Sequence, residues 1–321
     1  MYLNYYRLVC EPFDITPDPA FLYLSPSHKE ALGSIICGEQ MRKGVIVVTG
    51  EVGTGKTTII RTFLRHMNRS RTRVIYILNP FVTFEEILDE CLSVLEVETS
   101  TQTVNEKLRG VSNALIQHYS AGQNVVLIID EAQAMSVETL KQIRMLSNLE
   151  TTKDKLLQIV LVGQPELNQI LELDDMKPFK QRIAARATLS PLTFKESLEY
   201  LQHRLSLSQA PPAPIFRKSA LKRIARYAQG VPRVMNVIGH QALVAGFGSQ
   251  EKIIGADLVA DVIADYTGHP RKRRSASNWA MAIWCLFLTA ALILFVVVSQ
   301  VGLSSLLTTV KSWSHHLIGN P

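Results

Sequence analysis

The segment from Gly50 to Thr57 constrains the fold of this chain more than any other. It reads Gly-Glu-Val-Gly-Thr-Gly-Lys-Thr and matches the pattern G-x-x-x-x-G-K-[ST] without a gap. A short strand-like run over residues 45–49 precedes it, and a helical pattern over residues 57–67 follows it. Between a strand and a helix, this pattern forms a loop whose backbone surrounds phosphate groups. The sequence therefore predicts an α/β domain with a phosphate site after its first strand.

Each residue type in the loop has a physical role in holding phosphate. Glycines let backbone amides point at phosphate oxygens, and the following helix presents its positive N-terminal end. Lys56 is expected to reach the β- and γ-phosphates, and the Thr57 hydroxyl is expected to bind Mg²⁺. ATP is the expected nucleotide. The expected nucleotide-binding residues of the loop are Gly50, Glu51, Val52, Gly53, Thr54, Gly55, Lys56, Thr57 and Thr58.

A second motif begins with five consecutive apolar residues, 125–129, which end at Asp130 and Glu131. Ligands of parallel α/β sheets bind outside the carboxyl ends of the strands, where these carboxylates are expected to lie. Asp130 is a candidate Mg²⁺ ligand, directly or through water. Glu131 is a candidate base that orients and deprotonates the attacking water. The alternative is an acidic strand end that caps the next helix, but the upstream phosphate loop favours hydrolysis.

The rest of the chain divides into regions of different periodicity. Apolar runs that indicate strands alternate with helical patterns up to about residue 190, which predicts a parallel sheet covered on both faces. Expected strands are residues 45–49, 73–78, 125–129, 156–162 and 187–189. Only helices are expected afterwards, over residues 194–207, 217–229, 232–245 and 256–266. We therefore expect an N-terminal segment over 1–44, with a helix capped by Ser27, a core over 45–190 and a helical lid over 191–268.

The C-terminal region combines a basic cluster with an apolar run. The net charge of +6 is local, because residues 1–270 hold 29 basic and 28 acidic side chains, so it does not argue for nucleic acid. A basic linker over 269–278, containing Arg271-Lys-Arg-Arg274, precedes residues 279–298, which carry no charge. We expect this run to be one transmembrane helix, with residues 1–274 in the cytoplasm and a short periplasmic tail over 299–321. The alternatives are a buried core helix or a basic targeting signal.

Further residues connect the chain to a known family. The chain resembles the AAA+ ATPases of the general secretion pathway protein A family, which also occur in pilus biogenesis systems. The resemblance rests on motifs that extend from the N-terminus to the helical region. They are Tyr5-Tyr6, Glu11-Pro-Phe13, Thr16-Pro-Asp-Pro19, the run from Phe21 to His28, the phosphate loop, Asp130-Glu-Ala-Gln133, Gly163-Gln-Pro-Glu-Leu167 and Gly230-Val-Pro-Arg233.

The resemblance implies additional site residues. Gln164 follows an expected strand, where AAA+ proteins place a polar sensor of the γ-phosphate. Either Arg182 or Arg186 is expected to act on the neighbouring subunit of an oligomer by neutralising charge in the transition state. Arg233, in the first turn of a lid helix, is expected to face the nucleotide.

The resemblance also implies a cellular role. It predicts an ATP hydrolase of the bacterial inner membrane that works with a membrane partner, protein B of the same pathway, in assembly of a type II secretin or a pilus apparatus. Longer members carry a periplasmic peptidoglycan-binding domain after the membrane helix. Residues 299–321 are too short for one, so direct peptidoglycan binding is not expected from them.

Two other functions fit parts of the sequence. A DNA-binding ATPase of the transposition-regulator type shares the same core, and residues 200–250 hold seven Lys or Arg and no acid. Nucleic acid is nevertheless not the expected partner, because the apolar run has no role in that function. A nucleotide-binding scaffold with little turnover is the other alternative, and the presence of Lys56, Asp130 and Glu131 argues against it.

Overall fold

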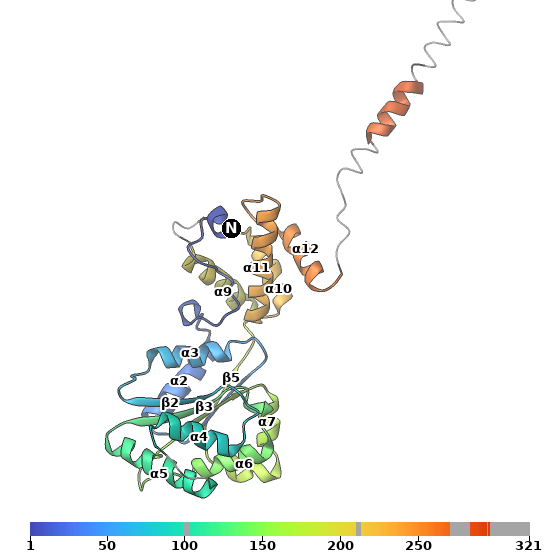
Figure 1. Ribbon diagram of the computed structural model, residues 1–321. Coiled ribbons are helices and arrows are strands. Elements are labelled where there is room, and N and C mark those ends of the chain that lie inside the picture. The colour runs from blue at the N-terminus through green and yellow to red at the C-terminus, as the bar shows by residue number, and fades with distance from the viewer. Residues whose placement is uncertain (99–102, 210–212, 270–282, 294, 296–321) are drawn as a thin grey trace, which may run out of the picture. The chain divides into compact units, whose positions relative to one another are not determined.

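The computed structural model describes residues 1–98, 103–209, 213–269, 283–293 and 295 (Figure 1). The chain forms two compact units, Met1–Gly268 and His269–Pro321. The first unit contains a sheet with its covering helices and a set of lid helices. The second unit is described separately at the end of this subsection.

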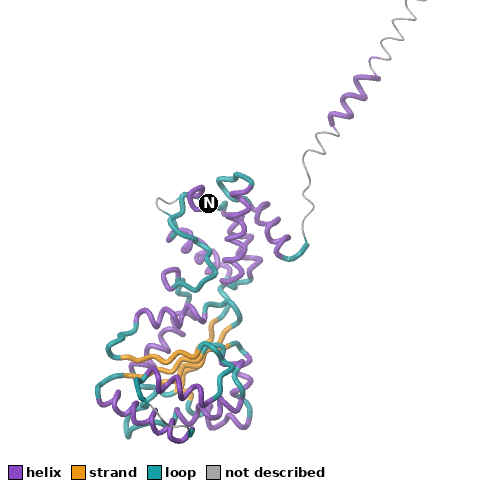
Figure 2. The backbone as a smooth tube through the Cα atoms, in the orientation of Figure 1, coloured by secondary structure: helices purple, strands orange, loops and turns teal. Residues whose placement is uncertain are grey.

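In the described residues, five parallel strands form the sheet, in the order β2-β3-β4-β1-β5. The strands, orange in Figure 2, lie between the helices. Their bounds are β1 Val45–Gly50, β2 Thr72–Ile77, β3 Asn124–Ile129, β4 Gln158–Gly163 and β5 Ile183–Leu189. The predicted α/β parallel sheet is therefore confirmed. The last strand begins earlier than the expected residue 187, so Arg186 lies within β5 and not before it.

The strands are buried because helices cover both faces of the sheet. Successive residues point to opposite faces, so Val47 joins one hydrophobic cluster and Val48 the other. The Val47 face packs against α4 Phe84–Val94, α5 Val104–Ser120, α6 Val137–Leu146, α7 Glu166–Leu171 and α8 Lys177–Lys180. The Val48 face packs against α2 Pro26–Gln40 and α3 Lys56–His66. Short 3₁₀ turns occur at Pro19–Phe21, Ala132–Ala134 and Asp174–Met176.

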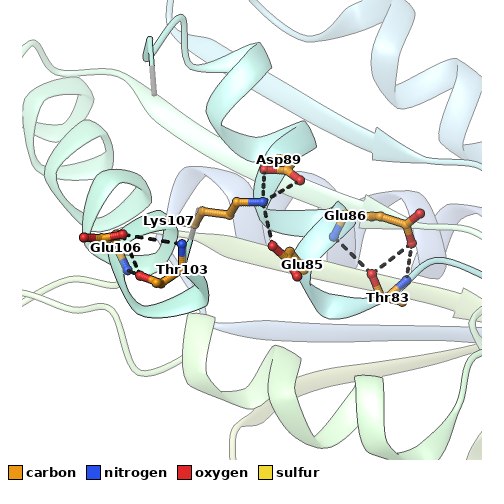
Figure 3. Close-up of polar contacts among 7 residues, drawn as sticks. All are labelled: Thr83, Glu85, Glu86, Asp89, Thr103, Glu106 and Lys107. Atoms are coloured by element: carbon orange, nitrogen blue, oxygen red, sulfur yellow. Dashed lines mark hydrogen bonds and ion pairs between the residues drawn. The ribbon is translucent and has the colours of Figure 1, made fainter. Parts of the chain in front are cut away.

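Helices α4 and α5 begin with the same local motif (Figure 3). Thr83 and Thr103 each form a capping box with the glutamate three residues later. The largely buried Lys107 then joins the two helices, because its Nζ donates to Glu85 at 2.9 Å and to Asp89 at 2.8 Å. These contacts define the start of each helix and hold α4 and α5 together.

The cap of α2 differs from the expected one. Ser25, and not Ser27, is the N-cap, and its hydroxyl accepts a hydrogen bond from the His28 amide. The reason is that Pro26 occupies the first helical position, where its missing N–H costs nothing. With this cap, His28 is the third residue of the helix and not the first.

The lid consists of α9 Phe194–Leu207, α10 Lys218–Ala228, α11 Pro232–Gly248 and α12 Ala256–Tyr266. The N-terminal helix α1 Tyr2–Tyr6 packs with them, and Tyr6, Leu8 and Phe13 are buried in the lid cluster. Arg204 holds this segment by donating to the carbonyl oxygens of Pro12 and, at 3.2 Å, Asp14. The first residues of the chain are therefore part of the lid's core.

In the second unit, residues 283–293 and 295 are helical. Apart from His269, the expected basic linker over 269–278 lies outside the described residues. The expected tail over 299–321 and the rest of the expected span over 279–298 lie outside them as well. In the part of the chain that the structure describes, no helix combines the length and apolar character needed to cross a membrane.

Candidate active site

A cavity of about 460 Å³ lies where the phosphate loop meets the N-terminal segment and the lid. Three regions far apart in sequence form its wall. The loop contributes Val52 to Thr58, the N-terminal segment contributes residues from Asp14 to His28, and the lid contributes Tyr200, Arg204, Pro232, Arg233 and Asn236. Glu131 also lines the cavity. The volume is within the range of small-molecule sites.

The phosphate loop has the backbone shape that its glycines permit. Gly53 and Gly55 have φ values of 80° and 105°, which side chains other than glycine rarely adopt. Lys56 is buried, and its Nζ donates to the carbonyl oxygens of Gly50 at 2.8 Å and Glu51 at 3.1 Å. An ammonium group has three donors, so one remains for a phosphate. Burial lowers the pKa of Lys56, while the nearby carboxylates, Glu131 foremost, act in the opposite direction.

The two predicted carboxylates follow β3 and differ in their surroundings. Asp130 is only 4% exposed, and its Oδ2 accepts a hydrogen bond from the Thr57 hydroxyl at 3.2 Å. Its Oδ1 accepts from the amide of Glu131 at 3.0 Å. Glu131 has a φ of 52°, a left-handed backbone conformation that is uncommon for residues other than glycine. Glu131 also lines the cavity. Thr57 and Asp130 thus form a pair of oxygen donors, and Glu131 faces the cavity.

Two glutamine side chains hold the Glu131 carboxylate. Gln133 Nε2 donates to Glu131 Oε2 at 2.7 Å, and Gln164 Nε2 donates to the same oxygen at 3.2 Å. Burial acts to raise the pKa of Glu131, but these hydrogen bonds and the charge of Lys56 outweigh it and lower the pKa below its ordinary value. The carboxylate is therefore ionised at neutral pH.

The lid contacts the loop directly through Arg233. The amide of Arg233 donates to the carbonyl of Gly53 at 3.3 Å, and Arg233 lines the cavity. A Cβ added to Gly53 would lie 2.7 Å from Arg233 Cβ, so the two backbones approach closely. The structure thus brings Arg233 to the loop, the position expected from the sequence.

The two candidate arginines lie elsewhere. Arg182 precedes β5, and its carbonyl oxygen accepts a hydrogen bond from the Val45 amide at 3.3 Å. Val45 is at the amino end of β1, whereas the phosphate loop follows the carboxyl end of the same strand. Arg186 is an exposed residue of the edge strand, and it contacts Asn168 at 3.4 Å and Glu172 at 3.9 Å. Neither arginine is part of the cavity wall in the described chain.

Sequence reasoning missed several residues of the site. His28 is buried against the loop, where its Nε2 lies 3.0 Å from the Thr54 carbonyl and its Nδ1 lies 2.6 Å from the Ser25 hydroxyl. Because burial lowers the pKa of His28, its neutral form is favoured. Gln133 ends the Asp130-Glu-Ala-Gln133 motif, and its contact with the Glu131 carboxylate is not expected from the sequence. Tyr76, on β2, donates to Asp130 Oδ2 at 3.1 Å.

Residues 39–171 match the family described as AAA domain. The chain is 38% identical over 263 residues to general secretion pathway protein A of Aeromonas hydrophila. That alignment covers 80% of this chain and 47% of the relative, so the chain spans about half of the relative's length.

Solved structures share the fold at low sequence identity. ORC2 of Aeropyrum pernix, in ADPNP–ADP complexes, is 17% identical with a TM-score of 0.60, covering 79% of this chain and 71% of the other. Cdc6p of Pyrobaculum aerophilum is 18% identical with a TM-score of 0.59, covering 77% and 68%. ORC1 of Aeropyrum pernix in complex with DNA is 16% identical with a TM-score of 0.59, covering 81% and 70%.

These matches confirm the predicted P-loop fold, the AAA domain and the resemblance to general secretion pathway protein A. The chain therefore carries an AAA domain and is a homologue of general secretion pathway protein A over most of its own length.

Proposed function

We propose that this chain hydrolyses ATP to support assembly of a bacterial secretion or pilus apparatus. The observation that carries the hydrolytic part is the Glu131 carboxylate, which lines the cavity beside Lys56 and Thr57 and is held by two glutamines. The secretion part is supported by the homology to general secretion pathway protein A. An ATPase of this kind needs a binding step, a hydrolytic step and a connection to its apparatus.

In the binding step, loop amides and Lys56 take the phosphates, while Arg233 approaches from the lid. The hydroxyl of Thr57 and the carboxylate of Asp130, 3.2 Å apart, are oxygen donors of the kind that Mg²⁺ prefers. Bound Mg²⁺ would neutralise charge on the β- and γ-phosphates. Thr57 and Asp130 are thus the residues of this chain that would hold it.

In the hydrolytic step, Glu131 orients a water molecule and accepts its proton. Its lowered pKa keeps the base ionised at neutral pH, and Gln133 and Gln164 fix its orientation. Gln164 follows β4, so it can report the state of the γ-phosphate to the rest of that strand. An arginine of a neighbouring subunit, Arg182 or Arg186, supplies the remaining positive charge, which makes the active form at least a dimer.

The connection to the apparatus is a membrane anchor and a partner. Residues 279–298 anchor the chain in the inner membrane, with the ATPase domain in the cytoplasm and the following residues in the periplasm. A membrane protein comparable to protein B of the general secretion pathway is the proposed partner. The support is the uncharged run with its basic N-terminal flank and the homology described above.

Two measurements test this proposal. The first is ATP turnover of the full chain in detergent, beside Lys56→Ala and Glu131→Gln. We expect Lys56→Ala to lose nucleotide binding, and Glu131→Gln to bind ATP but lose turnover by about 10²- to 10⁴-fold. Parent turnover equal to that of Lys56→Ala would refute hydrolysis. The second is cell fractionation, in which a fully soluble protein without a salt-resistant membrane pool would refute the anchor.

One observation favours a second function, DNA binding by the lid. Lys218, Lys222 and Arg226 are exposed at successive turns of α10, and the rest of residues 1–270 is net acidic once residues 200–250 are set aside. The named ORC1 structure is a DNA complex, although at 16% identity it shows only a shared fold. Salt-sensitive gel shifts lost in a triple Lys218→Glu, Lys222→Glu, Arg226→Glu variant would support this function. No shift at low salt would exclude it.

A further inference from the structure

The carboxylate of Asp130 is held by more than the phosphate loop. Asp130 Oδ2 accepts hydrogen bonds from two hydroxyl groups, Thr57 at 3.2 Å and Tyr76 at 3.1 Å. Its second oxygen, Oδ1, is taken by the amide of Glu131 at 3.0 Å. The three donors come from three places in the fold: the start of α3, the neighbouring strand β2 and the turn after β3. Tyr76 is the donor that belongs neither to the phosphate loop nor to the Asp130-Glu-Ala-Gln133 motif.

The register of the sheet explains why Tyr76 can reach this carboxylate. Tyr76 pairs with Ile128, two residues before Asp130, in the parallel β2–β3 ladder. Side chains two residues apart on a strand share a face, so Tyr76, Ile128 and Asp130 all project to the side of the sheet that α3 covers. A tyrosine is long enough to span the diagonal to the strand end. Its ring packs against the hydrophobic cluster of that face, which limits the positions of the hydroxyl.

The chemistry of the pair requires the tyrosine to donate its proton. An ionised carboxylate only accepts hydrogen bonds, so the phenol must be the donor. The hydrogen bond therefore limits the orientations of the carboxylate that would hold a divalent cation.

From these contacts we infer that Tyr76 is a positioning residue for Mg²⁺, which orients Asp130 toward the cation shared with Thr57 and the nucleotide. The inference rests on the proposed nucleotide function and adds a specific residue to it. Partners that hydrogen-bond to metal-ligating groups fix the orientation of those groups, and their loss weakens metal affinity by about 10- to 100-fold. Without its phenol, Asp130 would keep one side-chain donor in place of two and would rotate more freely.

The test uses the full chain in detergent and a fluorescent ATP analogue. Nucleotide affinity is measured first in EDTA and then as a function of added MgCl₂. For Tyr76→Phe we expect the EDTA affinity to equal that of the parent and the Mg²⁺ midpoint to rise about tenfold. Tyr76→Leu removes the ring as well, so it should show the same midpoint shift together with a lower melting temperature.

Tyr119→Phe is the matched control. The Tyr119 hydroxyl also donates to a carboxylate, Asp154 at 2.9 Å, but this pair is remote from the cavity wall. Its loss should leave the Mg²⁺ midpoint at the parent value. An unchanged midpoint in Tyr76→Phe, or an equal loss of affinity in EDTA, would overturn the positioning role. If the parent protein binds no nucleotide, or if its nucleotide affinity does not depend on Mg²⁺, the proposed function from which this inference starts would be refuted instead.

Discussion

Gln164 Nε2 lies 3.2 Å from Glu131 Oε2 and donates a hydrogen bond to it, which joins the ends of strands β4 and β3 beside the phosphate loop. The backbone amide of Gln164 also donates to Gln133 Oε1 at 2.9 Å, and Gln133 in turn donates to Glu131. The base is therefore held by a closed set of hydrogen bonds. In the proposed mechanism, a displacement of Gln164 would therefore also move Glu131, the proposed base.

The first prediction concerns the pH dependence of turnover. The pKa of Glu131 lies below its ordinary 4.5, so the base stays ionised as the pH falls through that value. Replacing Gln164 with alanine removes one of the donors that lower this pKa. We expect the acidic limb of the kcat profile to move to higher pH in Gln164→Ala and kcat to fall.

The control for this prediction is Gln169→Ala, on the exposed side of α7. Its profile should coincide with that of the parent. An acidic limb at the same pH in Gln164→Ala and in the parent would show that the Gln164 hydrogen bond does not tune Glu131.

The second prediction concerns stability and His28. Burial depresses the pKa of His28 below its ordinary 6.5 in the folded state. Its contribution to stability is therefore present above pH 6.5 and is lost as the pH falls below that value, because the unfolded chain binds the proton more readily. We expect the melting temperature to fall less between pH 7.5 and 5.5 in His28→Gln than in the parent. His66→Gln, on the surface of α3, should behave like the parent.

The sheet could be predicted from sequence because its central strands are continuous apolar runs buried on both faces. Residues 45–49 and 125–129 needed no tertiary information. The edge strand β5 is longer than the expected residues 187–189. Its first residues do not form a continuous apolar run, because only alternate positions there are partly buried. The cap of α2 is Ser25 and not the expected Ser27, and Pro26, a residue that favours the first helical position, is the sequence signal for it.

The site could be predicted only where one motif contains it. Lys56, Thr57, Asp130 and Glu131 lie in short patterns whose context is local. His28 and Tyr76 reach the site through the packing of α2 and the register of β2 against β3, and neither contact can be read from a local motif. The same holds for Phe13, whose burial in the lid depends on contacts with residues more than 200 positions away.

The third prediction separates the two candidate arginines. Arg182→Ala and Arg186→Ala should both bind ATP, and the variant that lacks the trans-acting arginine should lose turnover by roughly 10³-fold. Mixing that variant with Lys56→Ala should restore part of the activity, because one subunit then supplies the loop and the other the arginine. Turnover that is independent of protein concentration, with both arginine variants like the parent, would point to a monomeric nucleotide switch.

The final prediction concerns Gly230, which lies in the loop between α10 and α11. Its φ is 82°, and a Cβ at this position would lie 2.1 Å from the carbonyl oxygen of Leu192. The Leu192 amide donates to the Gly230 carbonyl at 2.8 Å, so the two backbones cannot separate without losing this bond. We expect Gly230→Ala to lower the free energy of unfolding by about 3 kcal/mol or more, since backbone strain and overpacking add.

Gly122→Ala isolates the strain from the overpacking. Gly122 has a φ of 73°, but a Cβ there would have no neighbour within 4 Å. Its substitution should therefore cost about 1–2 kcal/mol, the price of the left-handed conformation alone. Urea unfolding of the two variants gives the comparison directly. Equal losses would mean that the backbone at Leu192 yields to the added methyl group, and the junction between core and lid would then be softer than its close backbone contact indicates.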